Sequence, residues 1–164
     1  MVHVHSITTL DHPALQPFLT MRWQQPHRDA GIFVAEGEKC VRRLLESELK
    51  VVSLLLPEKW LEHHRLLLDR RVGEEIHVFI APKEALEQLT GYSMYQGVLA
   101  VGRIPPAWTL REAIERSASP RLFAAVDCLA NAENLGALVR NCVAFGVQRS
   151  EEHTSELPVT WPYL

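Results

Sequence analysis

The chain is poor in cysteine, has no long apolar run and carries no excess of positive charge. Its three cysteines among 164 residues are odd in number and lack CxxC spacing, so neither a disulfide framework nor a thiolate zinc site is indicated. No uninterrupted apolar stretch approaches the roughly 20 residues that a membrane-spanning helix needs. The N-terminus, with His3 and His5, does not resemble a signal peptide. We therefore expect a cytoplasmic protein without a membrane partner.

The charge balance limits how the chain could bind nucleic acid. Its net charge of −3 argues against a protein that coats nucleic acid without specificity, because neutralising phosphates requires a basic balance. Any such contact must therefore be local. The paired arginines at 42–43 and 70–71, taken alone, are more typical of a solvated helix face. The histidine pairs at 3 and 5 and at 63–64 lack a carboxylate or cysteine at metal-site spacing, so we expect no metal site.

From Ile32 to Gly102 short apolar runs alternate with amphipathic segments, a pattern that indicates an α/β fold. We expect strands at 32–36, 51–56, 76–80 and 97–102, and helices at 38–46, 58–70 and 82–89. Residues 1–31 are less clear. Apolar side chains there suggest an opening helix that ends at Pro26, because proline interrupts helical hydrogen bonding.

A boundary is expected at Pro105 and Pro106, because consecutive prolines neither continue a helix nor donate to a sheet. After it, Thr109 and Glu112 have the spacing of a capping box that begins a helix. A near-continuous apolar strand follows at 122–127. We therefore divide the chain into a first domain (1–104), a linker (105–110) and a second domain that begins at residue 111.

After that strand, a loop and a helix from about Asn134 form a β-loop-α element, whose helix N-terminus can offer unpaired N–H groups to an anion. Asn134 has the residue type of an N-cap. Arg140 lies roughly 9 Å further along the helix and should lean back over Gly136, where small residues leave room for a substrate. The opposite face, which we expect to pack, holds Leu135, Leu138, Cys142 and Phe145. Equally, Asn134 could be only a cap and Arg140 only a surface arginine.

The order of residues in this helix resembles the first signature motif of the SpoU/TrmH superfamily of RNA ribose 2′-O-methyltransferases. The matching residues are Asn131, Asn134, Gly136, Ala137, Arg140, Ala144, Phe145 and Gly146. One departure is Ala132, where the family commonly has proline. The resemblance implies that Asn134 and Arg140 are catalytic residues, with Arg140 activating or positioning the target ribose hydroxyl. Because a guanidinium almost never loses its proton, we expect Arg140 to hold phosphate and stabilise an alkoxide rather than act as a base.

The first domain strengthens this resemblance. The run Phe33–Lys39 before an amphipathic helix looks like the start of the family's substrate-binding domain, and Tyr95–Val101 looks like its end. The resemblance implies a ribosomal-protein-like RNA-binding α/β sandwich, followed by the start of a SpoU-type trefoil-knot methyltransferase domain at 111–148. Our candidates for RNA contact are Glu36, Lys39, Arg42 and Arg43, followed by Arg65 and Arg103.

The resemblance also implies S-adenosylmethionine as methyl donor, rRNA or tRNA as substrate, and a homodimer for the complete family member. No GxGxxG fingerprint occurs among the eight glycines. Family members instead bind the donor with the loops of a C-terminal knot, and the two motifs that build this pocket are absent from the sequence. We therefore expect a truncated and inactive fragment with no cofactor-binding residues of its own.

Residues 149–164 look foreign or disordered. They interrupt the pattern where a buried strand should follow Val147, and they are similar to the translation of a common short-read sequencing adaptor. Without further strands, residues 121–148 should be poorly ordered. The alternative to an enzyme is a non-enzymatic RNA-binding module in which residues 1–104 act alone.

Overall fold

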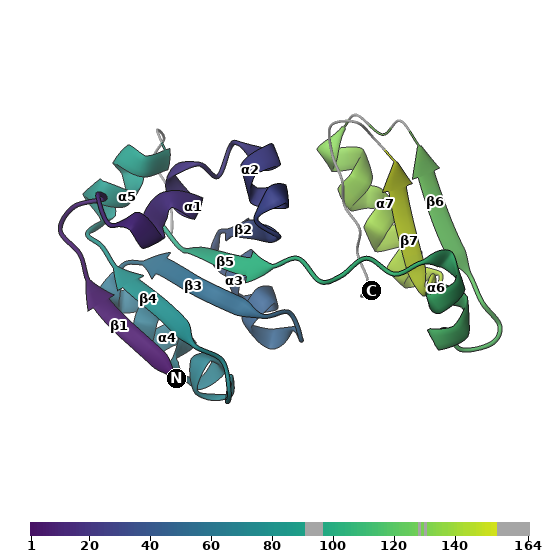
Figure 1. Cartoon of the computed structure of the whole chain (residues 1–164), viewed down its shortest axis with the longest axis horizontal. Coiled ribbons are helices and arrows are strands. Elements are labelled where there is room, and N and C mark those ends of the chain that lie inside the picture. Colours follow the sequence, from purple (N-terminus) through teal and green to yellow (C-terminus); the bar gives the residue numbers. More distant parts are fainter. Residues whose placement is uncertain (91–96, 128, 130, 154–164) are drawn as a thin grey trace. The chain divides into compact units, whose positions relative to one another are not determined.

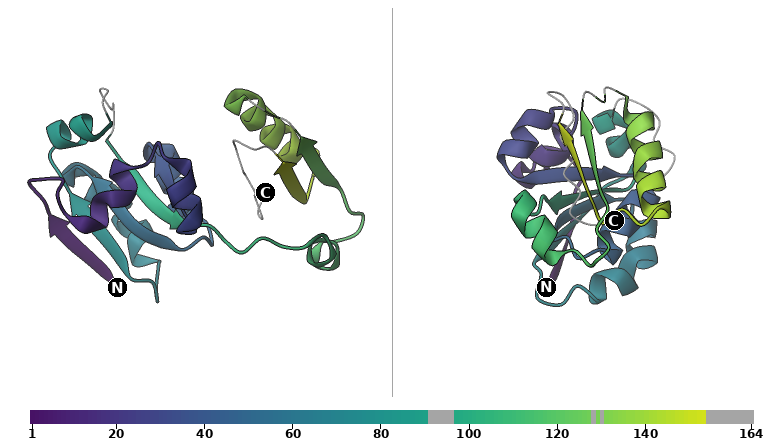
Figure 2. Two further views of the ribbon diagram at one scale, coloured as in Figure 1. Left: turned by 45° about the horizontal axis from the view of Figure 1, so that its top comes forward. Right: turned by 90° about the vertical axis from the view of Figure 1, so that its right-hand side faces the viewer.

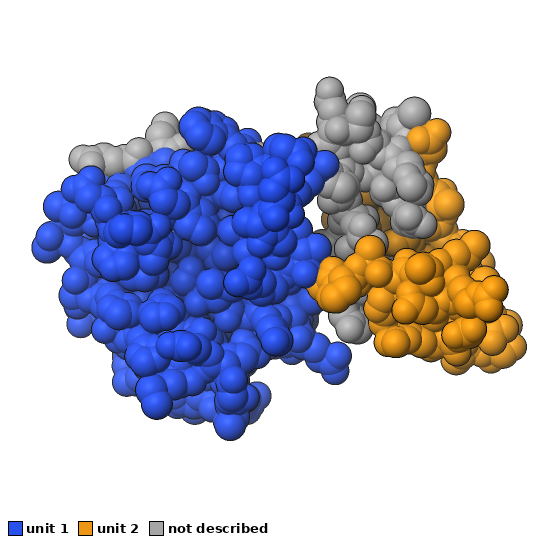
Figure 3. Space-filling model, viewed as in Figure 1, with its two compact units in different colours: residues 1–104 blue, residues 105–164 orange. Residues whose placement is uncertain are grey.

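The structure, a computed structural model, describes residues 1–90, 97–127, 129 and 131–153. The chain divides into two compact units, Met1–Ile104 and Pro105–Leu164 (Figure 3). The division falls directly before the two prolines, where neither a helix nor a sheet ladder can continue. No helix among the described residues has both the length and the apolar character needed to cross a membrane.

The first unit is built on a five-stranded mixed sheet (Figure 1). Its strands are β1 (Val2–Ser6), β2 (Ile32–Glu36), β3 (Val51–Leu56), β4 (Ile76–Ile80) and β5 (Leu99–Arg103). Their order is β1-β4-β3-β5-β2. β4 is parallel to both β1 and β3, whereas β5 is antiparallel to both β3 and β2. The expected α/β class is confirmed.

Helices cover both faces of this sheet, as the views in Figures 1 and 2 show. One face carries α3 (Glu38–Glu46) and α4 (Glu58–Asp69), and the other carries a 3₁₀ helix (η1, Pro13–Leu15), α1 (Gln16–Leu19) and α5 (Lys83–Thr90). A further short helix, α2 (Gln24–Asp29), contacts β2. Neighbouring strand residues point to opposite faces, so Leu54 belongs to one core and Leu55 to the other.

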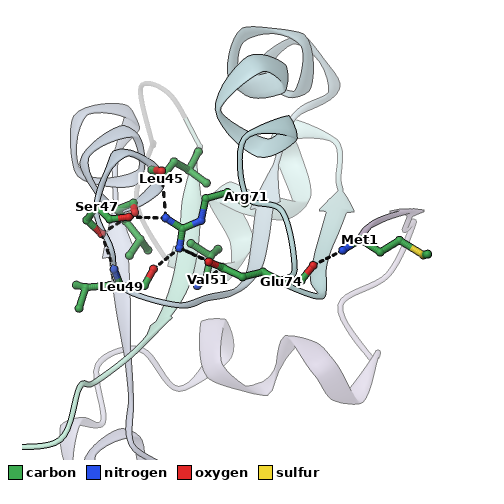
Figure 4. Close-up of polar contacts among 8 residues, drawn as sticks. Met1, Leu45, Ser47, Leu49, Val51, Arg71 and Glu74 are labelled. Carbon is green, nitrogen blue, oxygen red and sulfur yellow. Dashed lines mark hydrogen bonds and ion pairs between the residues drawn. The ribbon is translucent and has the colours of Figure 1, made fainter.

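A buried arginine fixes the connection between α3 and β3 (Figure 4). The side chain of Arg71 is only 8% exposed and forms an ion pair of 2.7 Å with Glu74. Its guanidinium also donates to three backbone carbonyl oxygens, those of Leu45, Ser47 and Leu49. Glu74 in turn accepts the backbone N–H of Val51 at 3.0 Å. The expectation of a solvated face is therefore wrong for Arg71, because the last turn of α3 and the segment after it place three carbonyl oxygens within reach of its guanidinium.

The second unit is a β-α-β arrangement preceded by a short helix. Its elements are α6 (Leu110–Arg116), β6 (Phe123–Asp127), α7 (Ala132–Ala144) and β7 (Arg149–His153). The predicted capping box is confirmed, since Thr109 Oγ1 accepts the N–H of Glu112 at 3.3 Å and the Glu112 carboxylate accepts the N–H of Thr109 at 2.8 Å. β7 pairs in parallel with β6. Regular structure thus begins where a disordered tail was expected, because ladder pairing uses the backbone and tolerates polar side chains.

The opening helix expected in residues 1–31 is present as η1 and α1, but its predicted end is wrong and one strand was not predicted. β1 is a strand that the sequence reading missed, although valine and histidine alternate along it with the period of a strand. Pro26 does not end a helix but lies in the first turn of α2. Proline is tolerated there because the first N–H groups of a helix have no intrahelical acceptor.

Candidate functional site

The first turn of α7 is capped by Asn131 and not by Asn134 as expected. The side-chain oxygen of Asn131 accepts the N–H of Glu133 at 2.7 Å and the N–H of Asn134 at 3.3 Å. The helix therefore begins one turn earlier than predicted. Two of the N–H groups that were expected to face an anion are already satisfied by this cap. Asn134 does not cap the helix and lies exposed in its first turn.

Arg140 leans back over Gly136, as its position in the helix predicts. A Cβ placed on Gly136 would lie 3.5 Å from Nη1 of Arg140. The guanidinium therefore occupies the space above the glycine, one helical turn before its own Cα. Gly136 makes room for the arginine head itself, while the side chain of Arg140 stays exposed to a ligand.

Asn134 and Arg140 do not share one side of α7. Six residues at 100° each place their side chains about 120° apart around the helix, and about 9 Å apart along it. Both are exposed, while Leu135 and Leu138 are partly buried and Cys142 is buried. Phe145 was expected on the packing face but is 76% exposed, because the helix ends before it and Gly146 turns the chain with a φ of 71°.

In the first unit, the structure brings most of the predicted RNA-contacting residues to the beginning of α3. Glu36 ends β2 and Lys39 lies in the first turn of the helix; both are exposed. Gly37 joins them with a φ of 89°, a conformation that side chains other than glycine's rarely adopt. No side chain caps the N-terminus of this helix.

Arg42 and Arg43 follow on α3 and share one carboxylate. Nε of Arg42 lies 2.8 Å from Oε1 of Glu46, and Nη1 of Arg43 lies 3.5 Å from Oε2 of the same residue. The hydrogen bond from Arg42 lowers the pKa of Glu46, and the same bond raises the pKa of Arg42. Both arginine side chains remain more than half exposed, at 58% and 86%.

The other two candidates lie apart from Glu36. Arg65 is on α4, a helix that contacts α3, where it pairs with Glu62 at 3.6 Å. Arg103 ends β5 opposite Ile32, whereas Glu36 faces Leu99. Four residues of strand, roughly 13 Å, therefore separate Arg103 from Glu36. Its guanidinium donates to the carbonyl oxygen of Ala30 at 3.3 Å.

One histidine of α4 is buried, which the sequence analysis did not predict. His63 is exposed and forms an ion pair of 3.5 Å with Glu38, which links α4 to the first turn of α3. His64 is fully buried and stacks on Trp60, with 6.0 Å between the ring centroids. Burial, together with the neighbouring His63, lowers the pKa of His64. The spacing of Leu61, His64 and Leu68 on one helical face was the signal for this burial.

A metal centre is not indicated by the described residues. Within 1–90, 97–127, 129 and 131–153, no group of three or more histidine, cysteine, aspartate or glutamate side chains is arranged to hold a metal ion.

Comparison with known proteins identifies relatives for most of the chain. Residues 34–108 match the family of domains described as RNA 2'-O ribose methyltransferase substrate binding (SpoU). The chain is 29% identical over 115 residues to the 23S rRNA (guanosine-2'-O-)-methyltransferase RlmB of Acinetobacter baylyi, covering 68% of this chain and 46% of RlmB. It is 25% identical over 148 residues to an uncharacterized tRNA/rRNA methyltransferase of Mycobacterium bovis, covering 88% of this chain and 49% of the relative. The chain thus spans about half the length of the curated relatives it matches.

Solved structures share the fold. An rRNA methyltransferase from Sinorhizobium meliloti superposes with a TM-score of 0.69 and 20% identity, over 94% of this chain and 57% of that protein. The SpoU methyltransferase AviRb from Streptomyces viridochromogenes gives a TM-score of 0.66 and 21% identity, over 92% of this chain and 55% of AviRb.

Proposed function

We propose that this chain, whose residues 34–108 match the substrate-binding domain of the SpoU RNA 2'-O ribose methyltransferases, binds RNA through its first unit and serves RNA methylation. The proposed activity is transfer of a methyl group to a ribose 2′-hydroxyl of rRNA or tRNA, in the cytoplasm. The observation that carries the proposal is the family match over 34–108, most of which lies in the first unit, where the predicted RNA contacts are exposed.

The proposed RNA-binding surface is the exposed side of α3 with the neighbouring part of α4. Lys39, Arg42 and Arg43 supply its positive charge, and Arg65 extends it onto α4. Glu46 already neutralises part of this charge. The surface is therefore better suited to bind a few phosphates specifically than to coat nucleic acid without specificity. Glu36, at the edge of the surface, can accept hydrogen bonds from base or ribose donors.

For catalysis we assign Arg140 to the phosphate beside the target ribose. Its protonated fork can hold two phosphate oxygens and stabilise the oxyanion that forms as the 2′-hydroxyl loses its proton. Asn134, about a third of a turn away around α7, would contact a different part of the same nucleotide. When bound, S-adenosylmethionine supplies the methyl group; no residue of this chain is assigned to hold it.

The second candidate is an RNA-binding module without catalysis. It is favoured by one observation, the match of residues 34–108 to a domain described as substrate binding. On this account the chain binds RNA and transfers no methyl group. The complete protein is proposed to be a homodimeric methyltransferase.

RNA binding is tested with a pair of charge variants. We expect Lys39→Gln with Arg43→Gln to lower affinity for a pool of rRNA and tRNA several-fold, and to reduce the salt dependence by about one ion per lost phosphate contact. Arg111→Gln, an exposed change in the second unit, is the matched control. Equal affinity of the double variant and the wild type, measured by fluorescence anisotropy, would contradict the assignment of this surface.

The catalytic assignment is tested in the complete protein. Arg140→Lys keeps the charge but loses the planar fork, so we expect methyl transfer from labelled donor to fall by at least about 100-fold while RNA affinity changes little. Turnover close to that of the unaltered enzyme would remove Arg140 from the mechanism.

A further inference from the structure

An exposed tryptophan lies in the turn between α1 and α2. Trp23 is 65% exposed, and Leu19, one turn earlier, is 41% exposed. Indole rings carry a large apolar area that normally enters a core or an interface, so an exposed one is informative where an isolated exposed leucine is not. Both side chains precede residues 34–108, the part of the chain that matches the substrate-binding domain.

The turn that carries Trp23 is held in place. The N–H of Trp23 donates to the carbonyl oxygen of Thr20 at 2.8 Å. Thr20 Oγ1 lies 3.1 Å from Nε2 of His27, a buried residue of α2. These bonds tie α2 to the end of α1 around the tryptophan. The backbone that carries the ring is therefore ordered. Little backbone conformational entropy would be lost when a ligand stacks on the indole.

Three arginines belong to this part of the chain or adjoin it. Arg22 precedes it, Arg28 lies on α2, and Arg103 donates to the carbonyl oxygen of Ala30 directly after α2. The nearby carboxylate, Asp29, accepts a hydrogen bond of 2.9 Å from Gln25. The formal charges of these three arginines and of Asp29 sum to +2, in a chain whose net charge is −3.

The spacing fits a short stretch of single-stranded nucleic acid. Trp23 and Ala30 stand at opposite ends of α2, seven residues or roughly 10 Å apart. A base stacked on the indole would place its flanking phosphates within reach of the long arginine side chains at both ends of the helix. Stacking accepts any base, because every base has a π-face.

We propose that Trp23, with Arg22, Arg28 and Arg103, forms a second RNA contact in which an unpaired base stacks on the indole and the arginines hold the neighbouring phosphates. This contact deepens the proposed RNA-binding function and rests on it. Arg103 lies too far from Glu36 to take part in RNA contacts at the start of α3, and this second contact gives it a role. The presence of three arginines in or beside this segment favours a polyanion over an apolar protein partner.

The test compares two RNA probes on the complete chain. One is a fluorescein-labelled 12-nucleotide oligouridylate and the other is a 12-base-pair RNA duplex. We expect Trp23→Ala to weaken oligouridylate binding about 5- to 100-fold, the equivalent of one lost stacked base, and to leave duplex binding within about twofold. Trp23→Phe, which keeps a π-face, should recover most of the affinity.

The control is Leu66→Ala, which removes another exposed apolar side chain, 73% exposed on α4. It should bind both probes like the wild type. Equal oligouridylate affinity for Trp23→Ala and wild type, or an equal loss on both probes, would overturn the stacking contact while leaving RNA binding by the first unit intact. If the wild type binds neither probe and no rRNA or tRNA, the proposed function itself fails, and this contact with it.

Discussion

The two units differ in how completely they cover their own apolar residues. In the first, helices on both faces of the sheet bury Leu54, Leu55 and Phe79 almost completely. In the second, one two-stranded sheet and α7 leave Val143 56% exposed and Phe145 76% exposed. Burying a leucine or phenylalanine side chain contributes about 1.5–3 kcal/mol. The comparison indicates that the first unit can fold alone and that the second depends on additional structure.

The largest expected effect tests this difference directly. A polypeptide of residues 1–104 should unfold in one cooperative transition, whereas residues 105–164 alone should show none, because too little apolar surface is removed from water. Thermal unfolding followed by circular dichroism measures both. A sharp transition in the second polypeptide, reported by Trp108 fluorescence, would show that the second unit is self-sufficient.

Within the first unit, the next effect concerns the buried arginine of Figure 4. Arg71→Met should lower the free energy of unfolding by about 3 kcal/mol, because three carbonyl groups and the Glu74 carboxylate lose their partner. Arg70→Met, its exposed neighbour, should cost less than about 0.5 kcal/mol. Urea unfolding of both variants gives the difference, and similar values would remove the structural role of Arg71.

A smaller effect should appear as the pH falls. The pKa of His64 is lowered in the folded state by burial and by His63, with Arg42 adding to the shift and Glu38 opposing it. The unfolded chain therefore takes up the proton more readily, so the stability of the first unit is full above about pH 6.5 and declines below it. His64→Leu should flatten the melting temperature between pH 7 and pH 5. Because His63 contributes to the shift, His63→Leu should flatten the slope less than His64→Leu does; an unchanged slope in His64→Leu would exclude this group.

The smallest effect separates stability from function in the second unit. Gly136→Ala should stabilise α7 by up to about 1 kcal/mol, since glycine is unfavourable inside a helix. The added Cβ would lie in ordinary contact with the Arg140 guanidinium, 3.5 Å from Nη1, and would fill the space beside it that we expect the substrate to occupy, so methyl transfer by the complete protein should fall even as stability rises. Melting and turnover measured together test this; a parallel rise in both would contradict the position assigned to Arg140.

The parts of the fold that sequence predicts well are those set by local patterns. β3 was expected at its observed bounds because an apolar run ends at Pro57, and the capping box at Thr109 was recognisable from spacing alone. The lean of Arg140 over Gly136 likewise follows from helical geometry. These features depend on residues within one or two turns of each other.

Predictions from the sequence failed where contacts between distant residues determine the structure, or where two neighbouring residues could fill the same role. Asn131 and Asn134 are both competent caps one turn apart, so residue type could not choose between them. Arg71 is buried because a loop more than 20 residues earlier in the chain supplies its acceptors. The assignments of Asn134, Arg140 and the RNA-contacting residues to their roles stay predictions.

The most direct test of the account is to compare RNA affinity between the complete chain and residues 1–104. Fluorescence anisotropy with a pool of rRNA and tRNA, at two salt concentrations, measures both. If the first unit is the RNA-binding part, its dissociation constant should lie within about threefold of that of the complete chain, with the same salt dependence. Loss of binding in residues 1–104, with retention in residues 105–164, would contradict the central claim.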